Sequence, residues 1–207
     1  MLIFDQTFYK DGVEYIVGVD EAGRGPLCGP VVAACCILPK DYFNEHINDS
    51  KKLNSKKRDE VYEEIVQNSL DFGVGIVDSK RIDEINIYEA TKEAMHLAIS
   101  SLKHKYDLIL TDAMKLENEK VAVVPIIKGD AKCECIAAAS IIAKVTRDRM
   151  LLEFDKKYPE YDFKSHKGYG TKRHIEAIKK YGVIKNFHRY SYEPIKSLLK
   201  NKEIKER

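Results

Sequence analysis

Apolar residues along the chain follow two alternating patterns. Short runs rich in β-branched and other apolar residues, bounded by Gly, Pro or acidic residues, are typical of buried strands. They predict strands at residues 15–20, 31–38, 72–77, 107–111 and 121–127. Longer segments with apolar residues at helical spacing, some with a capping residue in front, predict helices at residues 54–70, 87–106, 133–158, 171–181 and 194–200.

The order of these elements predicts the fold class. Two strands in succession, followed by alternating helices and strands, are typical of an α/β protein with a mixed sheet. The final third of the chain is helical, and no low-complexity linker precedes it. We therefore expect an α/β core over residues 1–157 and a helical extension over residues 158–207, joined in one compact unit.

Composition narrows the class of protein. Of the 207 residues, 44% are hydrophobic and 33% are charged, which excludes a disordered or fibrous chain. The longest apolar run covers residues 31–38, whereas a membrane-spanning helix needs about 20 residues. The N-terminus lacks the basic start of a signal peptide, so we expect a cytoplasmic protein with no membrane partner. The five cysteines form no CxxC pair, which indicates buried thiols in a reducing compartment.

Charge is distributed unevenly, although the formal net charge is only +2. Residues 1–50 carry a net −5 and residues 59–127 a net −7, whereas residues 51–58 carry +5 and residues 128–207 carry +9. Such a separation is typical of a protein that presents a basic surface to a polyanion, although solvated helix faces would give the same totals.

Acidic residues stand at the ends of three predicted strands. Asp20 and Glu21 end the first strand, Asp112 follows the fourth, and Asp130 comes soon after the fifth. Binding sites in open sheets are built at strand ends. Four carboxylates brought together would repel one another unless cations held them, and an all-oxygen ligand set favours Mg²⁺ or Mn²⁺ over zinc. Taken singly, each of them could equally be an ordinary turn residue.

Strand geometry sets one condition on this cluster. Neighbouring residues in a regular strand point to opposite faces, so Asp20 and Glu21 share a site only if the chain bends between them. Ala22 and Gly23 follow directly, and they favour a bend or bulge at this point.

Two further segments have the composition of a ligand site. In the loop Gly23-Arg24-Gly25, two glycines around an arginine would let a ligand approach the backbone, although a tight turn is the simpler interpretation. Residues 49–52 (DSKK) precede a predicted helix, where a hydroxyl, lysines and backbone amides suit either a phosphate or a solvated helix cap.

The segment 164–189 holds eight basic residues and one acid, with aromatic residues between them. Basic residues interleaved with aromatic rings are typical of nucleic-acid binding. Tyr169 lies between Gly168 and Gly170, so we expect its ring to be exposed. The six histidines show no metal-binding spacing. His166 and His188 lie in this basic segment, where a histidine either contacts phosphate or is an ordinary surface residue, and we expect a surface position for both.

Four motifs together resemble those of ribonuclease HII, the type 2 ribonuclease H family. They are residues 19–26 (VDEAGRGP), residues 48–53 (NDSKKL), residues 128–130 (KGD) with 138–148 (AASIIAKVTRD), and residues 166–171 (HKGYGT). Their order and spacing fit the family from about residue 15 to residue 197, which is nearly the whole chain.

The resemblance implies a ribonuclease H-like fold, with a mixed five-stranded sheet flanked by helices and a helical C-terminal extension. It also implies an endoribonuclease that hydrolyses the RNA strand of RNA–DNA hybrids and cuts 5′ to single ribonucleotides embedded in duplex DNA. The products would carry a 3′-hydroxyl and a 5′-phosphate. These nucleic acids are the implied partners, no organic cofactor is implied, and we expect a monomer.

By position, the resemblance identifies Asp20, Glu21, Asp112 and Asp130 as catalytic ligands of two Mg²⁺ or Mn²⁺ ions. It implies that Gly23, Arg24 and Gly25 read the 2′-hydroxyl with their backbone, and that Tyr169 stacks on the sugar of the following deoxynucleotide. The other substrate contacts that it implies are Lys51, Ser140, Lys144, Arg147, His166 and Lys167.

Two departures from the family pattern are visible. Asp112 is followed by Ala113, where Asp-Gly is commoner in the family, so the motif supports Asp112 least of the four acids. The pattern near the C-terminus survives only in part, as residues 188–194 (HRYSYEP). The related type HIII enzyme usually carries a further N-terminal domain, and the segment before residue 15 is too short for one.

Two other functions stay open. A non-catalytic module that binds RNA–DNA hybrids would use the same basic segment, but it does not need strand-end acids that repel phosphate in the absence of a metal. Another metal-dependent nuclease of the same fold would share the acids. The Gly-Arg-Gly loop and Tyr169 argue against that second alternative, but only through the resemblance.

Overall fold

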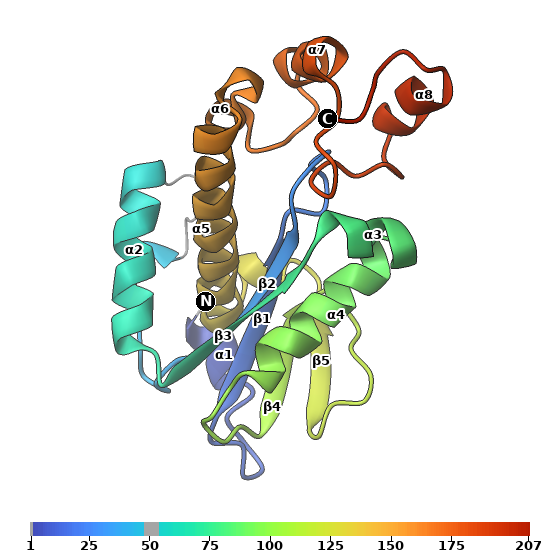
Figure 1. The fold of residues 1–207 in the computed structure, drawn as a ribbon. Helices are drawn as coiled ribbons and strands as arrows, with labels where there is room; N and C mark the ends of the chain where they lie inside the picture. The colour runs from blue at the N-terminus through green and yellow to red at the C-terminus, as the bar shows by residue number, and fades with distance from the viewer. Residues whose placement is uncertain (1, 48–53) are drawn as a thin grey trace. The chain divides into compact units, whose positions relative to one another are not determined.

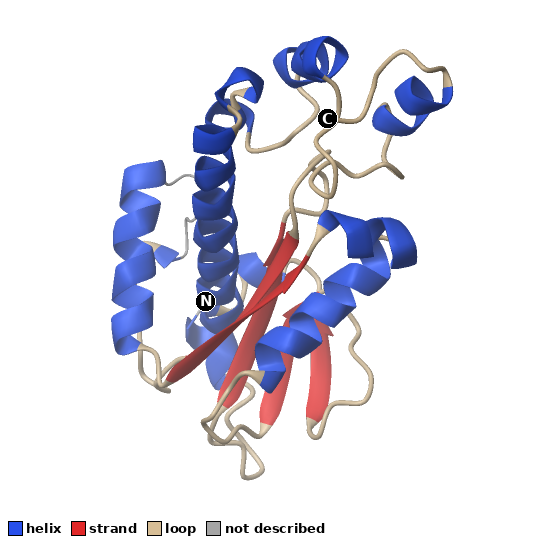
Figure 2. Cartoon of the chain, in the orientation of Figure 1, coloured by secondary structure: helices blue, strands red, loops and turns tan. Residues whose placement is uncertain are grey.

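The computed structural model describes residues 2–47 and 54–207, and it contains a five-stranded sheet flanked by helices (Figures 1 and 2). The strands are β1 (Ile16–Ala22), β2 (Val31–Ile37), β3 (Asp71–Val77), β4 (Leu108–Asp112) and β5 (Ala122–Ile126). The helices are α1 (Leu2–Gln6), α2 (Ser55–Asn68), α3 (Ser79–Ile85), α4 (Ile87–Ser100), α5 (Glu134–Lys157), α6 (Phe163–His166), α7 (Lys172–Tyr181) and α8 (Ile195–Lys200), with short 3₁₀ turns η2 (Gly129–Ala131) and η3 (Pro159–Tyr161).

The sheet is mixed and has the strand order β3-β2-β1-β4-β5. β1 pairs with β2 in the antiparallel sense, whereas β1 with β4 and β4 with β5 are parallel pairs. This arrangement confirms the predicted α/β class, and all five predicted strands are present within two residues of their expected bounds.

The helix predicted over residues 87–106 is wrong at its C-terminal end, because α4 stops at Ser100. The carboxylate of Asp71 accepts hydrogen bonds from the backbone N–H groups of Lys103 (2.7 Å) and His104 (2.9 Å). These amides are satisfied outside a helix, so the chain turns toward β4. Three helices, α1, α3 and α6, were not predicted, since segments of five, seven and four residues are too short to show a helical period.

The chain divides into two compact units. Unit 1 takes Met1–Ala22, Val32–Ile76 and Lys92–Val145, and unit 2 takes Gly23–Val31, Val77–Thr91 and Thr146–Arg207. The helix α5 contributes its first half to unit 1 and its second half to unit 2. The division into a core over residues 1–157 and an extension over residues 158–207 stays a prediction.

In unit 1, helices cover the sheet closely because glycines line the contact. A Cβ atom at Gly18 of β1 would lie 2.1 Å from the backbone of Cys135, at the start of α5. A Cβ atom at Gly75 of β3 would lie 1.9 Å from the carbonyl oxygen of Ala94 in α4. The main core of unit 1 includes small residues of α5, which allow the same close approach: Ala137, Ala138, Ala139 and Ala143.

Unit 2 has a core of its own, which is rich in aromatic residues. Tyr161 and Phe163 stack with their ring centroids 5.3 Å apart, and Phe187 packs edge-on against Phe163 at 5.1 Å. The loop before β2 joins this core through the buried side chains of Leu27 and Cys28. Across both units, all five cysteines are buried free thiols, which confirms the expectation for these residues.

No helix in the part of the chain that the structure describes is both long enough and apolar enough to cross a bilayer.

Candidate active site

Asp20 and Asp112 lie at the carboxyl ends of two adjacent parallel strands of unit 1. The ladder pairs Val19 of β1 with Thr111 of β4, and the next residue along each strand is an aspartate. Because side chains alternate along a strand, Asp20 and Asp112 share the face of Ile16 and Leu110, which pack in the core with α5. The two carboxyl groups therefore stand on the face of the sheet that α5 covers.

Asp20 is buried, and burial raises its pKa well above the usual range. The negative charges of Glu21 and Asp112 raise this pKa further, while hydrogen bonds from Ser140 of α5 and from the backbone N–H of Glu21 (2.7 Å) lower it. A fully ionised cluster is therefore unfavourable unless a cation compensates it. These oxygen donors at one strand end fit a hard divalent ion such as Mg²⁺ or Mn²⁺.

The bend predicted between Asp20 and Glu21 is wrong. β1 pairs residue for residue with β2 through Ala22, and the first residue with a left-handed backbone is Gly23, with φ of 97°. Asp20 and Glu21 thus leave a regular strand toward opposite faces. The Asp20 and Glu21 carboxylates still interact electrostatically, because they belong to adjacent residues near the end of β1.

Asp112 is tied to the segment that carries Asp130. Its Oδ1 atom accepts a hydrogen bond from the backbone N–H of Gly129 (2.8 Å), in the 3₁₀ turn η2. Gly129 has no room for a side chain, because a Cβ atom there would lie 2.7 Å from Cδ1 of Ile136 in α5. The half-buried Asp130 therefore sits in a turn that is fixed both to the end of β4 and to α5.

Two of the expected substrate contacts lie on α5 within unit 1. Ser140 and Lys144 are half-buried and stand four residues apart, so they share one face of the helix. The side chain of Ser140 forms a hydrogen bond with Asp20 and so contacts the acidic cluster directly. Lys51 and the other residues of segment 49–52 lie outside the described residues.

In unit 2, the Gly23-Arg24-Gly25 loop is held from the inside by Arg189. The guanidinium group of Arg189 is 0% exposed and donates to the carbonyl oxygens of Gly23 (2.6 Å), Arg24 (3.0 Å) and Gly29 (2.8 and 3.0 Å). The hydroxyl of Tyr192 also donates to the Arg24 carbonyl (2.7 Å). The loop is thus a rigid turn whose outer residues, Arg24 and Gly25, are exposed.

Tyr169 lies against this loop and is 48% exposed, which confirms the expectation of an accessible ring. Lys167 and Gly168 both have left-handed backbones, with φ of 50° and 86°, and this turn directs Tyr169 outward. A Cβ atom at Gly25 would lie 3.5 Å from the tyrosine ring, so the absence of a side chain there leaves the ring room beside the loop.

Arg147 and His166 are not at the surface, contrary to the expectation of substrate contacts. Arg147 is 1% exposed and donates to the carbonyl oxygens of Cys28, Pro30 and Lys167, each at 3.0 Å. The ring nitrogens of the buried His166 bond to the Tyr161 carbonyl (2.8 Å) and the Gly168 N–H (3.1 Å). Both side chains brace the protein backbone.

His188 is also buried, so the expected surface position is wrong for it as well. Its Nδ1 accepts from the Ile184 N–H (2.9 Å), and its Nε2 lies 3.2 Å from Nε2 of His174. His188 Nε2 must therefore carry the proton and donate to His174, whose Nδ1 donates in turn to the Tyr169 carbonyl (3.0 Å). Burial lowers the pKa of His174 to about 4 and that of His188 to about 3, each helped by a neighbouring histidine.

Cys28, His174 and His188 place three ligand atoms within 4.8 Å of one another, which is compatible with a metal site. The hydrogen bonds exclude this use. His188 accepts a proton donor at Nδ1, so metal binding at its Nε2 would leave the ring with no proton at all. The cluster is a chain of neutral rings that fixes the backbone of Tyr169.

Comparisons with known proteins show which family this chain belongs to. A family model described as Ribonuclease HII matches residues 17–195. A protein named Ribonuclease HII from Acetivibrio thermocellus is 55% identical over 192 residues, which cover 93% of this chain and 75% of that protein. The chain belongs to the ribonuclease HII family.

Solved structures share the fold of this ribonuclease HII family member. The ribonuclease H2 from Pyrococcus horikoshii OT3 matches with a TM-score of 0.78 and 30% identity, covering 90% of this chain and 98% of that one. Bst-RNase HIII, solved in complex with Mn²⁺, matches with a TM-score of 0.69, covering 96% of this chain and 72% of that one. At 17% identity, this second likeness concerns the fold alone.

Membership of the ribonuclease HII family makes the chain an endoribonuclease of the metal-dependent ribonuclease H class, which acts on RNA–DNA hybrids. The resemblance seen in the sequence is thereby confirmed, and so are the enzyme class and the ribonuclease H-like fold.

Sequence reasoning missed two residues of this ribonuclease HII site, Arg189 and Tyr192, as braces of the Gly-Arg-Gly loop. Arg189 is one of the eight basic residues of segment 164–189, whose composition predicts a nucleic-acid-binding surface. No local signal marks Arg189 as internal, because its buried neighbour Phe187 is one of several aromatic residues that lie between the basic residues of this segment.

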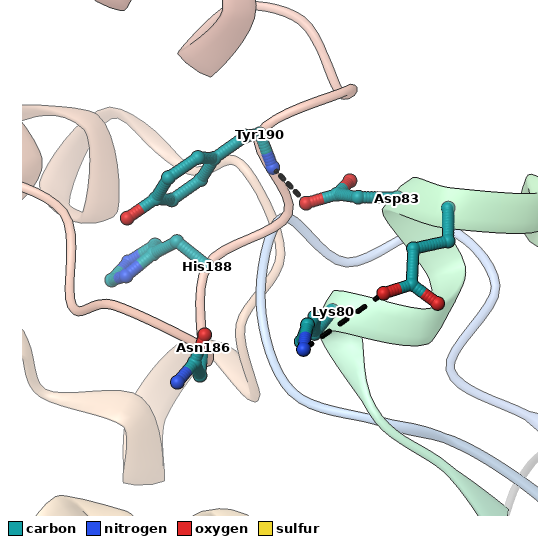
Figure 3. Close-up of a pocket in the computed structure, with 6 residues that line it drawn as sticks. Lys80, Asp83, Asn186, His188 and Tyr190 are labelled. Atoms are coloured by element: carbon teal, nitrogen blue, oxygen red, sulfur yellow. Dashed lines mark hydrogen bonds and ion pairs between the residues drawn. The ribbon is translucent and has the colours of Figure 1, made fainter.

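A pocket of about 330 Å³ in unit 2 lies between α3 and the segment around Arg189 (Figure 3). Its lining includes Asp83, which accepts hydrogen bonds from the backbone N–H groups of Tyr190 (2.7 Å) and Ser191 (2.9 Å). These bonds anchor α3 to the segment that carries Arg189. The lining comprises Lys80, Asp83, Glu84, Asn186, His188 and Tyr190.

Proposed function

We propose that this protein cuts the RNA strand of RNA–DNA hybrids and also cuts 5′ to single ribonucleotides in duplex DNA, leaving 3′-hydroxyl and 5′-phosphate ends. The observation that carries the proposal is the pair of adjacent strand ends with Asp20 and Asp112, where burial and Glu21 make uncompensated negative charge unfavourable. Such a site favours a divalent cation, and phosphodiester hydrolysis needs one.

In this proposal Asp20, Glu21, Asp112 and Asp130 would hold two Mg²⁺ or Mn²⁺ ions. Glu21 leaves β1 toward the opposite face, so it would reach the ions by turning its side chain around the end of the strand. When bound, two such ions supply an activated water and stabilise the leaving oxyanion. The hydroxyl of Ser140 orients the Asp20 carboxylate by donating a hydrogen bond to it. The ammonium groups of Lys144 and Lys167 attract the phosphates, and Lys51 has the same proposed role.

Selection for RNA falls to the loop of unit 2. The 2′-hydroxyl is the difference between RNA and DNA at the scissile nucleotide, and the backbone of Gly23, Arg24 and Gly25 can hydrogen-bond it whatever the base. A loop held rigid by Arg189 rejects a sugar without that hydroxyl, because a polar group would be left unpaired. We therefore expect little dependence on base sequence.

Tyr169 completes the proposed recognition. Its exposed ring beside Gly25 suits stacking on the sugar of the nucleotide that follows the ribonucleotide. Arg147 and His166 enter the proposal as braces of this region, in place of the substrate contacts expected for them.

The test is cleavage of a labelled DNA duplex that carries one ribonucleotide, in Mg²⁺, with an all-DNA duplex and EDTA as controls. We expect a single cut 5′ to the ribonucleotide that requires both the metal and the 2′-hydroxyl. If only a continuous hybrid is cut, the role proposed for Tyr169 fails. If neither substrate is cut in Mg²⁺ or Mn²⁺, a non-catalytic hybrid-binding module becomes the better explanation.

Asp20→Asn tests the site itself. The variant should lose Mg²⁺-dependent cleavage and keep hybrid binding, since binding depends on the basic surface. Mg²⁺ should raise the urea midpoint of the wild type and leave that of the variant unchanged. Retained turnover in D20N would show that Asp20 is not a ligand of the reaction.

A further inference from the structure

The side chain of Arg147 joins two backbone segments of unit 2 that lie far apart in the sequence, residues 28–30 and Lys167. Its Nε and Nη2 atoms donate to the carbonyls of Pro30 and Cys28, which follow the Gly-Arg-Gly loop, and its Nη1 donates to the carbonyl of Lys167. The planar guanidinium thus spans the loop and the turn that carries Tyr169.

The same side chain also packs against the loop itself. A Cβ atom at Gly23 would lie 2.1 Å from Nε of Arg147, and one at Gly29 would lie 3.5 Å from Nη2. Gly23 has no side chain at the place that the guanidinium occupies, so the position of Arg147 fixes where the loop begins.

A second contact holds the turn in register with the loop. The backbone N–H of Leu27 donates to the carbonyl of Gly168 (2.8 Å), directly before Tyr169. This single hydrogen bond acts at one point, whereas Arg147 makes three bonds in a plane and resists both translation and rotation. The ring of Tyr169 and the Gly23–Gly25 loop are therefore held in a fixed position relative to each other.

We propose that Arg147 is a positioning residue that sets the spacing between the Gly23–Gly25 loop and Tyr169, and thereby the preference for a ribonucleotide followed by DNA over a continuous RNA strand. The inference rests on the proposed function, in which the loop reads one sugar and Tyr169 stacks on the next. Only a ribonucleotide followed by a deoxyribose makes both the loop contact and the stacking contact with Tyr169. The preference for such a substrate therefore depends on the spacing between the loop and Tyr169.

Arg189 provides a matched control. It is an equally buried arginine that also donates to backbone carbonyls, but its guanidinium bonds stay within residues 23–29 and Tyr192. Loss of Arg189 should loosen the loop without uncoupling it from Tyr169, and so should weaken cleavage of both substrates alike.

The experiment compares kcat/KM on two duplexes of one sequence, a single-ribonucleotide duplex and a continuous RNA–DNA hybrid. The variants are Arg147→Lys, Arg147→Met, Tyr169→Ala, the double variant R147K/Y169A, and Arg189→Lys. A lysine keeps the charge but cannot span three carbonyls, and a methionine keeps only part of the apolar stem. The urea midpoint of each variant reports whether it is folded, and hybrid cleavage by the same sample gives a second check for the Arg147 and Tyr169 variants.

We expect R147K and R147M to lower the ratio of single-ribonucleotide to hybrid cleavage by roughly tenfold or more, since misplacement of a positioned group by about 1 Å can cost a hundredfold. Y169A should lower the ratio to a similar extent. The double variant should be no worse in ratio than Y169A alone, because both changes remove one coupled contact. R189K should leave the ratio close to that of the wild type.

Three results would overturn the inference. An unchanged ratio in both Arg147 variants would make the residue a purely structural brace. Additive effects on the ratio in R147K/Y169A would mean that Arg147 does not act through Tyr169. If the wild type leaves the single-ribonucleotide duplex intact, the proposed function fails and this inference fails with it, whereas the first two results leave that function standing.

Discussion

Ala113 shows how one residue accommodates a departure from the family pattern. It follows Asp112 at the end of β4 and has a left-handed backbone, with φ of 55°. Steric repulsion destabilises a residue with a Cβ atom by about 1 kcal/mol or more in this conformation, whereas glycine adopts it freely. The backbone N–H of Ala113 donates to the carbonyl of Ile126 (3.1 Å), so a hydrogen bond holds the turn in this conformation despite the strain.

We expect Ala113→Gly to stabilise the protein by about 0.5–1 kcal/mol, because relief of this strain outweighs the greater freedom of glycine in the unfolded chain. Urea denaturation measures the change. Ala122→Gly is the control, since Ala122 is an exposed residue of β5 and its replacement should destabilise the strand. Equal losses of stability in the two variants would contradict the argument.

At the scale of elements, buried histidines connect α6, α7 and the segment before α8. The rings of His166 and His174 stack with centroids 4.3 Å apart, and His174 bonds to His188. Each ring must be neutral for its hydrogen bonds to hold, because a charged ring would place a donor against another donor. The elements of unit 2 are thus joined by polar contacts that depend on protonation.

Acid should therefore weaken unit 2. The folded pKa values of about 4 for His174 and about 3 for His188 lie below the unfolded value of about 6.5. The unfolded chain binds more protons below pH 6.5, so stability falls as pH decreases from 6.5 toward 4. Between pH 7 and pH 5 the loss should reach roughly 2 kcal/mol for each histidine.

Urea midpoints at pH 7 and pH 5 measure this loss. His174→Gln should be less sensitive to acid than the wild type, whereas His46→Gln, which alters a side chain that is 40% exposed, should be as sensitive as the wild type. The same acid sensitivity in all three proteins would mean that other groups control it.

At the scale of the whole molecule, positive charge is concentrated in one part of the chain. Residues 128–207 carry a net +9, and the exposed lysines of segment 164–189 lie in unit 2. Some of these charges are already paired, as in the 3.0 Å contact of Arg173 with Asp162. The unpaired remainder favours binding to a polyanion with strong dependence on salt.

We expect affinity for a hybrid to fall steeply with salt, and Lys167→Gln to reduce the slope of log K against log salt by about 1. Anisotropy of a labelled hybrid, with D20N as the background, measures binding without cleavage. Two hybrids of different base sequence should lose affinity equally. A strong dependence on base identity would contradict contact through phosphates.

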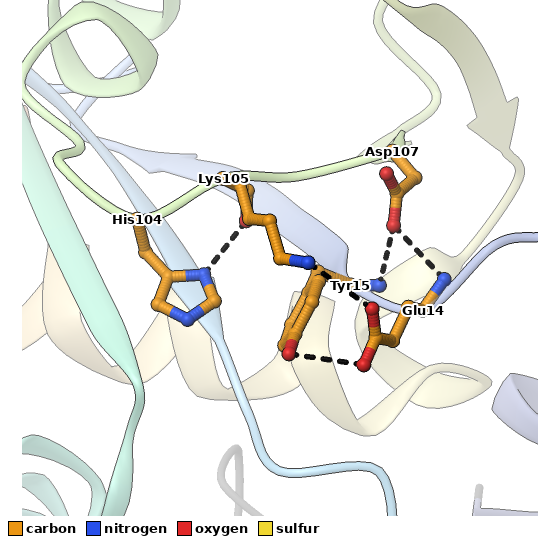
Figure 4. Close-up of polar contacts among 5 residues, drawn as sticks. All are labelled: Glu14, Tyr15, His104, Lys105 and Asp107. Carbon is orange, nitrogen blue, oxygen red and sulfur yellow. Dashed lines mark hydrogen bonds and ion pairs between the residues drawn. The ribbon is translucent and has the colours of Figure 1, made fainter.

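Lys105→Gln is the matched control for this measurement (Figure 4). Lys105 pairs with Glu14 (3.2 Å) near the amino ends of β1 and β4, where Asp107 also accepts the backbone N–H groups of Glu14 and Tyr15. This is the opposite end of the two strands from Asp20 and Asp112, so the variant should leave the slope unchanged.

The sequence by itself determined the strands, the mixed α/β fold and the strand-end positions of Asp20, Glu21 and Asp112. Strands can be predicted from short local runs of apolar residues, and the residue that ends such a run lies in the same short stretch of sequence. The family followed from motifs that are contiguous in the chain.

Tertiary structure alone decided that Arg147, Arg189 and three histidines are internal. The carbonyls that satisfy Arg189 lie about 160 residues away, and those of Arg147 come from segments on both sides of it in the chain. A basic residue within a charged segment has the same local pattern whether it binds phosphate or backbone. Its burial depends on polar partners that only the folded chain brings within hydrogen-bonding distance.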